Sequence, residues 1–88
     1  MKIVYDPVKD ALNTVKHGVS LGFAAGFEWA SAVQWHDTRS AYGEQRQCAL
    51  GYIGRRLYFM AFVERATQCR VISLRKANLR EVSRYAKT

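Results

Sequence analysis

The sequence contains few of the residues that build covalent frameworks or metal sites. Its two cysteines, Cys48 and Cys69, are too few for a disulfide framework. Each lies in an apolar run, where a free thiol packs as a small hydrophobe. The two histidines, His17 and His36, do not stand at metal-ligand spacing from the cysteines. We therefore expect no metal site, and we expect the chain to reside in a reducing cytosol.

Long apolar runs and glycine-rich phosphate loops are also lacking. The longest apolar run, residues 57–63, is far too short to cross a bilayer as a helix. The first residues do not form a basic segment followed by an apolar core, so we expect no secretory signal. Gly22 and Gly26 do not follow a predicted strand, which argues against a nucleotide-binding loop. We therefore expect neither a membrane partner nor a nucleotide cofactor.

Acidic residues are scarce in the second half of the chain. Residues 1–44 hold four lysines and arginines against five acidic residues, a net charge of −1, whereas residues 45–88 hold ten against two, a net charge of +8. A basic half suits an anionic partner, and RNA, DNA and an acidic protein all qualify; a solubilising surface is the alternative. The chain of 88 residues is long enough for one domain, 1–88, with a modest core.

Periodicity and turn residues predict an α+β domain with two N-terminal helices, a four-stranded antiparallel meander and a C-terminal helix. Asp6 and Pro7 are typical of a helix start and Gly18 of a helix end. Ser20 predicts the N-cap of a second, short helix through about Ala25. The predicted strands are residues 32–37, 46–53, 56–65 and 69–75, the last helix is 76–85, and residues 2–5 are extended. The expected apolar stripes are Val8, Ala11, Leu12 and Val15 on the first helix, and Leu79, Val82 and Ala86 on the last.

The stretch from Arg70 to Ala77 is the most informative candidate for a functional site, because an apolar strand ends there and presents cations at a stiff position. Strand alternation places Arg75 with Val71 and Ser73, on the face opposite Arg70, Ile72 and Leu74. Arg65 and Arg75 then lie at opposite ends of neighbouring strands. A single site that used both arginines would require a substrate that lies along the sheet.

Arginine is well suited to phosphate chemistry, because its guanidinium stays charged and offers a planar fork of donors. In RNA cleavage without a metal ion, the 2′-hydroxyl attacks the adjacent phosphate, and fixed cations stabilise the transition state. A base must take the hydroxyl proton, and His17 is the natural candidate, with Lys16, Lys76 and Glu44 as weaker ones. Each residue also has an ordinary interpretation: the arginines can be solvated or paired with a glutamate, and His17 can favour the helix dipole.

The order of residues resembles that of one protein family over nearly the whole chain. The most specific motifs are Lys16-His17-Gly18-Val19-Ser20 near the start and Ile72-Ser73-Leu74-Arg75-Lys76-Ala77 near the end. Further matches are Tyr5-Asp6-Pro7, Lys9, Asn13, Phe27-Glu28-Trp29-Ala30, Asp37, Arg39, Tyr42-Gly43-Glu44, Arg46, Gly51, Arg65, Arg70-Val71, Asn78, Glu81 and Tyr85. Together they resemble the BrnT-type toxins of bacterial type II toxin–antitoxin systems. The second helix departs from the family, because it carries Gly22 and Gly26 where many relatives have Glu- and Ala-rich residues.

The resemblance implies a RelE-like fold and a cytoplasmic ribonuclease that needs no metal ion or other cofactor and arrests translation. It also implies a BrnA-like antitoxin with a ribbon-helix-helix part, contact with operator DNA only through that antitoxin, and a complex of two toxins and two antitoxins. On this basis the catalytic candidates are Arg65, Arg75 and His17, and the RNA-binding candidates are Lys16, Arg46, Arg70 and Lys76. The alternative is a catalytically inactive basic module that binds an acidic antitoxin segment or nucleic acid.

Overall fold

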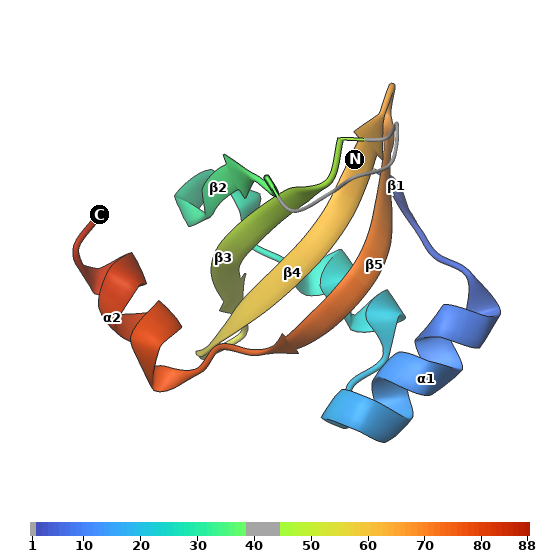
Figure 1. Ribbon diagram of the computed structural model, residues 1–88, viewed down its shortest axis with the longest axis horizontal. Coiled ribbons are helices and arrows are strands. Elements are labelled where there is room, and N and C mark those ends of the chain that lie inside the picture. Colours follow the sequence, from blue (N-terminus) through green and yellow to red (C-terminus); the bar gives the residue numbers. More distant parts are fainter. Residues whose placement is uncertain (1, 39–44) are drawn as a thin grey trace.

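The computed structural model describes residues 2–38 and 45–88, which form a five-stranded sheet with helices along its edge and on both of its faces (Figure 1). The strands are β1 (Lys2–Val4), β2 (Val33–His36), β3 (Gln47–Ile53), β4 (Arg56–Arg65) and β5 (Gln68–Lys76), in the spatial order β1-β5-β4-β3-β2. The helices are α1 (Pro7–His17) and α2 (Leu79–Ala86), with the 3-10 helices η1 (Leu21–Gly26) and η2 (Trp29–Ser31) between α1 and β2.

This arrangement corrects the predicted fold class. The class is α+β, but the sheet is mixed and has five strands, because β1 pairs in parallel with β5. The predicted four-stranded antiparallel meander is therefore wrong, although β2 to β5 do follow one another in antiparallel order. The second N-terminal helix is also wrong as an α-helix, since residues 21–26 form a 3-10 helix. Its expected cap is confirmed: the Ser20 hydroxyl accepts a hydrogen bond from the Gly22 N–H at 3.2 Å.

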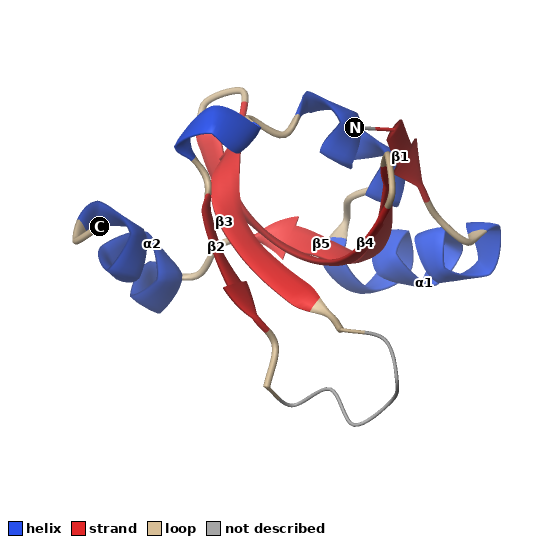
Figure 2. Cartoon of the chain, turned by 90° about the horizontal axis from the view of Figure 1, so that it is seen from above, coloured by secondary structure: helices blue, strands red, loops and turns tan. Residues whose placement is uncertain are grey.

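The main core lies between the sheet and the two 3-10 helices, and Figure 2 shows the sheet curling around them. Leu21, Ala24 and Phe27 meet strand residues that include Met60 and Phe62, all of them buried. Gly51 lets this contact form, because a Cβ at that position would collide with the ring of Phe27. The 3-10 helices therefore cover one face of the sheet and leave the other for α2.

The opposite face carries α2 and a second, smaller core. Leu50, Leu57 and Ala77 are buried there, with Tyr52 and Tyr85 packed against them. The Tyr85 hydroxyl donates a hydrogen bond to the Ser31 carbonyl oxygen at 2.9 Å. The apolar stripe predicted for this helix is thus wrong: Leu79 is 88% exposed and Val82 is 43% exposed, and Tyr85 makes the contact instead.

Helix α1 covers the edge of β5 through an asparagine. β1 pairs only with residues 68–70 of β5, and further along the strand Asn13 donates to the Leu74 carbonyl oxygen at 2.8 Å. Asn13 also accepts from the Leu74 N–H at 3.2 Å, so its side chain takes the place of a neighbouring strand. The apolar stripe predicted for this helix faces outward, with Val8, Leu12 and Val15 between 64% and 88% exposed.

A β-bulge in β5 decides which side chains share a face. Ser73 pairs with Ala61, but Val71 pairs with Phe62, so Ile72 is an extra residue in the strand. The predicted faces of β5 are therefore wrong, because alternation is interrupted at the bulge. Val71 and Leu74 both enter the main core. The face opposite this core, here called the outer face, carries Phe59, Val63, Arg65, Arg70 and Arg75.

Candidate functional site

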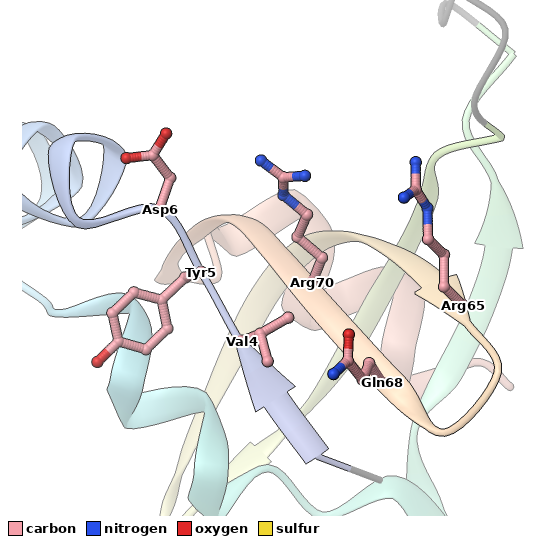
Figure 3. A pocket seen from close by; sticks show the side chains of 6 residues that line it. All are labelled: Val4, Tyr5, Asp6, Arg65, Gln68 and Arg70. Atoms are coloured by element: carbon pink, nitrogen blue, oxygen red, sulfur yellow. The ribbon is translucent and has the colours of Figure 1, made fainter.

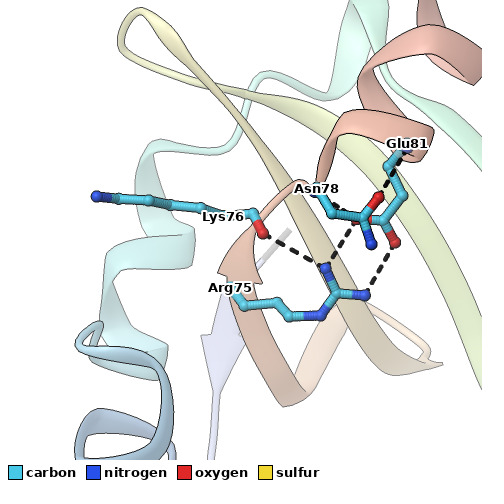
Figure 4. Close-up of polar contacts among 4 residues, drawn as sticks. All are labelled: Arg75, Lys76, Asn78 and Glu81. Carbon is cyan, nitrogen blue, oxygen red and sulfur yellow. Dashed lines mark hydrogen bonds and ion pairs between the residues drawn. The ribbon is translucent and has the colours of Figure 1, made fainter.

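Arg75 is fixed at the end of β5 by contacts on two sides. Its guanidinium lies 4.4 Å from the centroid of the Phe59 ring, which belongs to the opposite residue on β4. Its Nη1 and Nη2 donate hydrogen bonds to the two carboxylate oxygens of Glu81, at 2.7 and 2.9 Å (Figure 4). The side chains of Arg75 and Glu81 are only 29% and 17% exposed. A strand end, an aromatic ring and a helix therefore hold this cation in one orientation.

Glu81 connects Arg75 to the start of α2. The Glu81 side chain accepts from the Asn78 N–H at 2.9 Å, and the Asn78 side chain accepts from the Glu81 N–H at 2.9 Å, which is a capping box. The hydrogen bonds from Arg75 lower the pKa of the Glu81 carboxyl, with a smaller contribution from the Asn78 backbone. The carboxylate is thus charged near neutral pH and orients the guanidinium.

His17 lies at the last residue of α1, beside a hollow of about 260 Å³ between α1 and β5. Lys9 and Lys16 line the helix side of this hollow, and Ile72 and Ser73 line its strand side. The pKa of His17 is lowered, first by partial burial and then by the charges of Lys16 and Arg75. The lowered pKa favours the neutral imidazole, which is the form that a general base requires.

Arg84 is a further cation near Arg75, and sequence reasoning did not select it. Its guanidinium lies 4.1 Å from the centroid of the Trp35 ring. A hollow of about 320 Å³ has Arg75, Glu81 and Arg84 on its wall, together with Trp35, Phe59 and other residues of β2 and β3. Arg84 could have been found from its position one helical turn after Glu81, because residues one turn apart lie on the same face of a helix.

The remaining candidates lie elsewhere. Arg65 and Arg70 are on the outer face with Arg75, but at the other end: Arg75 pairs with Phe59, and Arg65 lies six residues further along β4, which is about 20 Å. Lys76 pairs with Tyr58, a main-core residue, and thus lies on the opposite face from Arg75.

Two further candidates complete the comparison with the sequence. Arg46 is exposed and precedes β3, where its carbonyl oxygen accepts a hydrogen bond from the Asp37 N–H at 2.9 Å. Glu44 lies outside the described residues. The structure thus places His17 and Lys16 in the hollow between α1 and β5, Arg75 in the neighbouring hollow under α2, and Arg65 at the other end of the sheet.

A family model described as "Ribonuclease toxin, BrnT, of type II toxin-antitoxin system" matches residues 5–81. The chain belongs to the BrnT family. No individual curated protein matches it. The resemblance expected from the sequence is confirmed, and with it the general activity, since BrnT proteins are ribonuclease toxins that act in pairs with an antitoxin. The matched span contains the Arg75 clamp, which we define as Arg75 with the two residues that hold it, Phe59 and Glu81, and it also contains His17.

Two searches of the described residues complete the account of this BrnT chain. No group of three or more histidines, cysteines, aspartates or glutamates in residues 2–38 and 45–88 is placed to hold a metal ion together. In the same part of the chain no helix is both long and apolar enough to cross a membrane.

Proposed function

We propose that this BrnT toxin cleaves RNA in the cytoplasm without a metal ion, with Arg75 and His17 as its catalytic residues. The observation that carries the proposal is the guanidinium of Arg75, which Glu81 and Phe59 hold in one orientation at the end of β5. Such a preorganised cation stabilises the negative charge that gathers on a phosphate during attack. Arg65 was expected to join this site, but it lies about 20 Å from Arg75 along the sheet, which is too far for both arginines to contact one phosphate.

Arg75 can bind a phosphate while Glu81 holds it. A guanidinium has five N–H donors, and Glu81 takes one from Nη1 and one from Nη2. The second Nη1 donor points toward the Lys76 carbonyl oxygen at 3.4 Å. The Nε–H and one Nη2–H remain for phosphate oxygens. In this mechanism the neutral imidazole of His17 takes the proton from the 2′-hydroxyl, whose oxygen then forms a bond to phosphorus. The bond from phosphorus to the 5′-oxygen breaks, and the leaving 5′-oxygen takes a proton from water.

The test is cleavage of RNA by the purified chain in the presence of EDTA. We expect cleavage to persist in EDTA, and Arg75→Ala to lower kcat by about 100-fold or more, as expected for the loss of a preorganised transition-state donor. Arg55→Gln is the charge-matched control, because Arg55 lies in the exposed turn between β3 and β4. Absence of cleavage in EDTA, or equal rates for Arg75→Ala and the wild type, would contradict the proposal.

The same proposal includes the finer features of a toxin–antitoxin pair. The expressed toxin arrests translation, and a BrnA-like antitoxin with a ribbon-helix-helix part neutralises it. Two toxins and two antitoxins form the complex, which represses its own operon through the antitoxin. Membership of the BrnT family supports these features. Growth arrest upon expression, rescue by the adjacent antitoxin gene, and a mass of the co-purified complex that fits two of each chain are the results expected.

The exposed stripe of α1 is the surface we propose for the antitoxin. Val8, Leu12 and Val15 present apolar area that no described part of this chain covers, and Lys9 and Lys16 flank it. An antitoxin segment with apolar and acidic side chains would complement both features. We expect Leu12→Asp to weaken antitoxin binding by more than tenfold, because it puts a charge in the buried centre of the contact. Leu79→Asp, at the exposed start of α2, is the control and should bind the antitoxin normally.

A further inference from the structure

A pocket of about 330 Å³ lies at the end of the sheet remote from Arg75 (Figure 3). Val4, Tyr5, Asp6, Arg65, Gln68 and Arg70 line it. It is built by the first residues of the chain, which run beside β5, and by the ends of β4 and β5, which meet at the turn between them. Three strands thus fix its position, and sequence segments far apart supply its walls.

The pocket presents two guanidiniums in the same direction. Figure 3 shows the side chains of Arg65 and Arg70 extending to the same side of the sheet, away from its surface. The register agrees, since Arg70 pairs with Val63 and Arg65 with Gln68, which puts both arginines on the outer face. Both residues are exposed, so neither is committed to the core. Paired arginine forks with an amide between them suit the oxygens of one phosphate group or two adjacent ones.

We infer that this pocket binds a backbone phosphate of the RNA substrate, several nucleotides away from the bond that is cut. The inference rests on the proposed function, because it takes the Arg75 end of the outer face as the place of cleavage. Arg65 and Arg70 then anchor the strand, and Arg75 and His17 act on it. The two groups of residues are separate parts of one binding face, and the arginines of the pocket act on substrate binding rather than on the chemical step.

The separation of the two groups sets the length of RNA that can use both. The distance from Arg75 to Arg65 along the sheet is about 20 Å. Three backbone bonds advance an extended protein chain by about 3.5 Å, so the six bonds between successive phosphates advance an extended RNA strand by about 7 Å. The pocket phosphate therefore lies about three nucleotides from the scissile one. A substrate trimmed to fewer nucleotides on that side cannot reach the pocket.

Asp6 adds a carboxylate to the rim of the pocket. Its Oδ1 accepts a hydrogen bond from the Val8 N–H at 2.8 Å, so it caps α1 while its charge opposes a phosphate. Asparagine caps helices as well as aspartate does. Asp6→Asn therefore removes the negative charge with the cap retained, and should lower KM for RNA by several-fold. The arginine and aspartate variants thus move RNA binding in opposite directions.

The experiment maps the cut site on a long RNA and then compares substrates trimmed one nucleotide at a time from either side. For the wild type we expect kcat/KM to fall about tenfold when one side, and only one, is cut to fewer than three nucleotides from the scissile phosphate, as for the loss of a charged hydrogen bond. In Arg70→Gln the penalty for this trimming should shrink, because only Arg65 remains to hold the phosphate. Arg55→Gln should keep the full penalty.

A binding measurement separates failure of this inference from failure of the proposed function. Anisotropy with a 2′-O-methyl RNA needs no cleavage, and Arg70→Gln should reduce the slope of log K against log salt by about 0.7, the value for one lost phosphate contact on a single strand. If cleavage depends on Arg75, but trimming lowers kcat/KM as much in Arg70→Gln as in the wild type, only the inference about the pocket is overturned. A variant that binds RNA with an unchanged slope and the antitoxin more weakly would assign the pocket to the antitoxin instead. If the wild type does not cleave RNA, but Arg70→Gln still reduces the slope of log K against log salt as expected, only the ribonuclease mechanism is overturned.

Discussion

Glu81→Gln is the substitution that isolates the Arg75 clamp from the capping of α2. Glutamine retains an oxygen that can accept from the Asn78 N–H, and Gln is as suitable as Glu at this position of a capping box. Its amide nitrogen, however, is a donor and faces the Nη2 donor of Arg75, which now bonds to Oε2. The variant therefore loses the charged two-point contact and keeps the cap, so its effects report on the clamp.

The size of the effect follows from the exposure of the pair. Exposed ion pairs contribute about 0.2–1 kcal/mol, and hydrogen bonds to charged groups about 1.5–3 kcal/mol. The side chains of Arg75 and Glu81 are 29% and 17% exposed, so we expect their contribution to lie between that of an exposed ion pair and that of a hydrogen bond to a charged group. We expect Glu81→Gln to lower the free energy of unfolding by about 1–2 kcal/mol at pH 7, which for a domain of this size corresponds to about 5–10 °C in Tm.

The pH dependence supplies the decisive part of the assay. Since the Glu81 pKa is lowered in the folded chain, the stabilisation is complete above the unfolded pKa and is lost as pH falls through the folded one. The free energies of unfolding of the wild type and Glu81→Gln in urea should therefore differ at pH 7 and converge as the pH falls below the folded-state pKa of Glu81. Glu64→Gln, at an exposed position on β4, is the control for a lost carboxylate. If the free energies of unfolding of the wild type and Glu81→Gln differ by the same amount at every pH, or do not differ at pH 7, then Glu81 does not stabilise the fold through its charged contact with Arg75.

Three further substitutions or profiles test other parts of the structure. Asn13→Ala should destabilise the fold by about 2–3 kcal/mol in urea titrations, because it leaves the buried N–H and C=O of Leu74 unpaired, and a change below 0.5 kcal/mol would contradict the edge contact. Gly51→Ala should cost at least about 1–3 kcal/mol by the same assay, since its Cβ meets the Phe27 ring, whereas Gly18→Asn should be tolerated at its φ of 73°. The rising limb of a kcat–pH profile should lie below the ordinary histidine range, because the lowered pKa keeps His17 neutral at more acidic pH, and a limb above that range would exclude His17 as the base.

Local signals in the sequence were sufficient for much of the secondary structure. Asp6 caps α1 through the Val8 N–H, Gly18 ends it with a left-handed backbone, and Gly54, with a φ of 62°, lies in the turn between the strands predicted at 46–53 and 56–65. β4 has the predicted bounds. These features depend on the preferences of single residues for particular backbone angles, which act within a few positions. Such preferences can be read from any sequence that contains them.

These local preferences could not predict which strands pair over long distances in the sequence. β1 has three residues, too few to show alternation, and its partner β5 begins more than sixty positions later. The orientation of α1 was misjudged for a related reason, because the contact that fixes it is made by Asn13 rather than by an apolar stripe. Sequence periodicity reports how much apolar area a helix has, and it does not report whether this chain or a partner covers that area.

The site itself depends on one residue that the sequence does not mark. From Val71 to Leu74 the chain continues as an apolar strand, and nothing in its composition indicates that Ile72 is extra. Without the bulge, strict alternation would place Arg70 and Arg75 on opposite faces, so that one of them would point toward the main core. With it, Val71 and Leu74 both enter the core and Arg70 joins Arg65 and Arg75 on the outer face. The bulge is therefore the reason that cations from both ends of the sheet lie on one face.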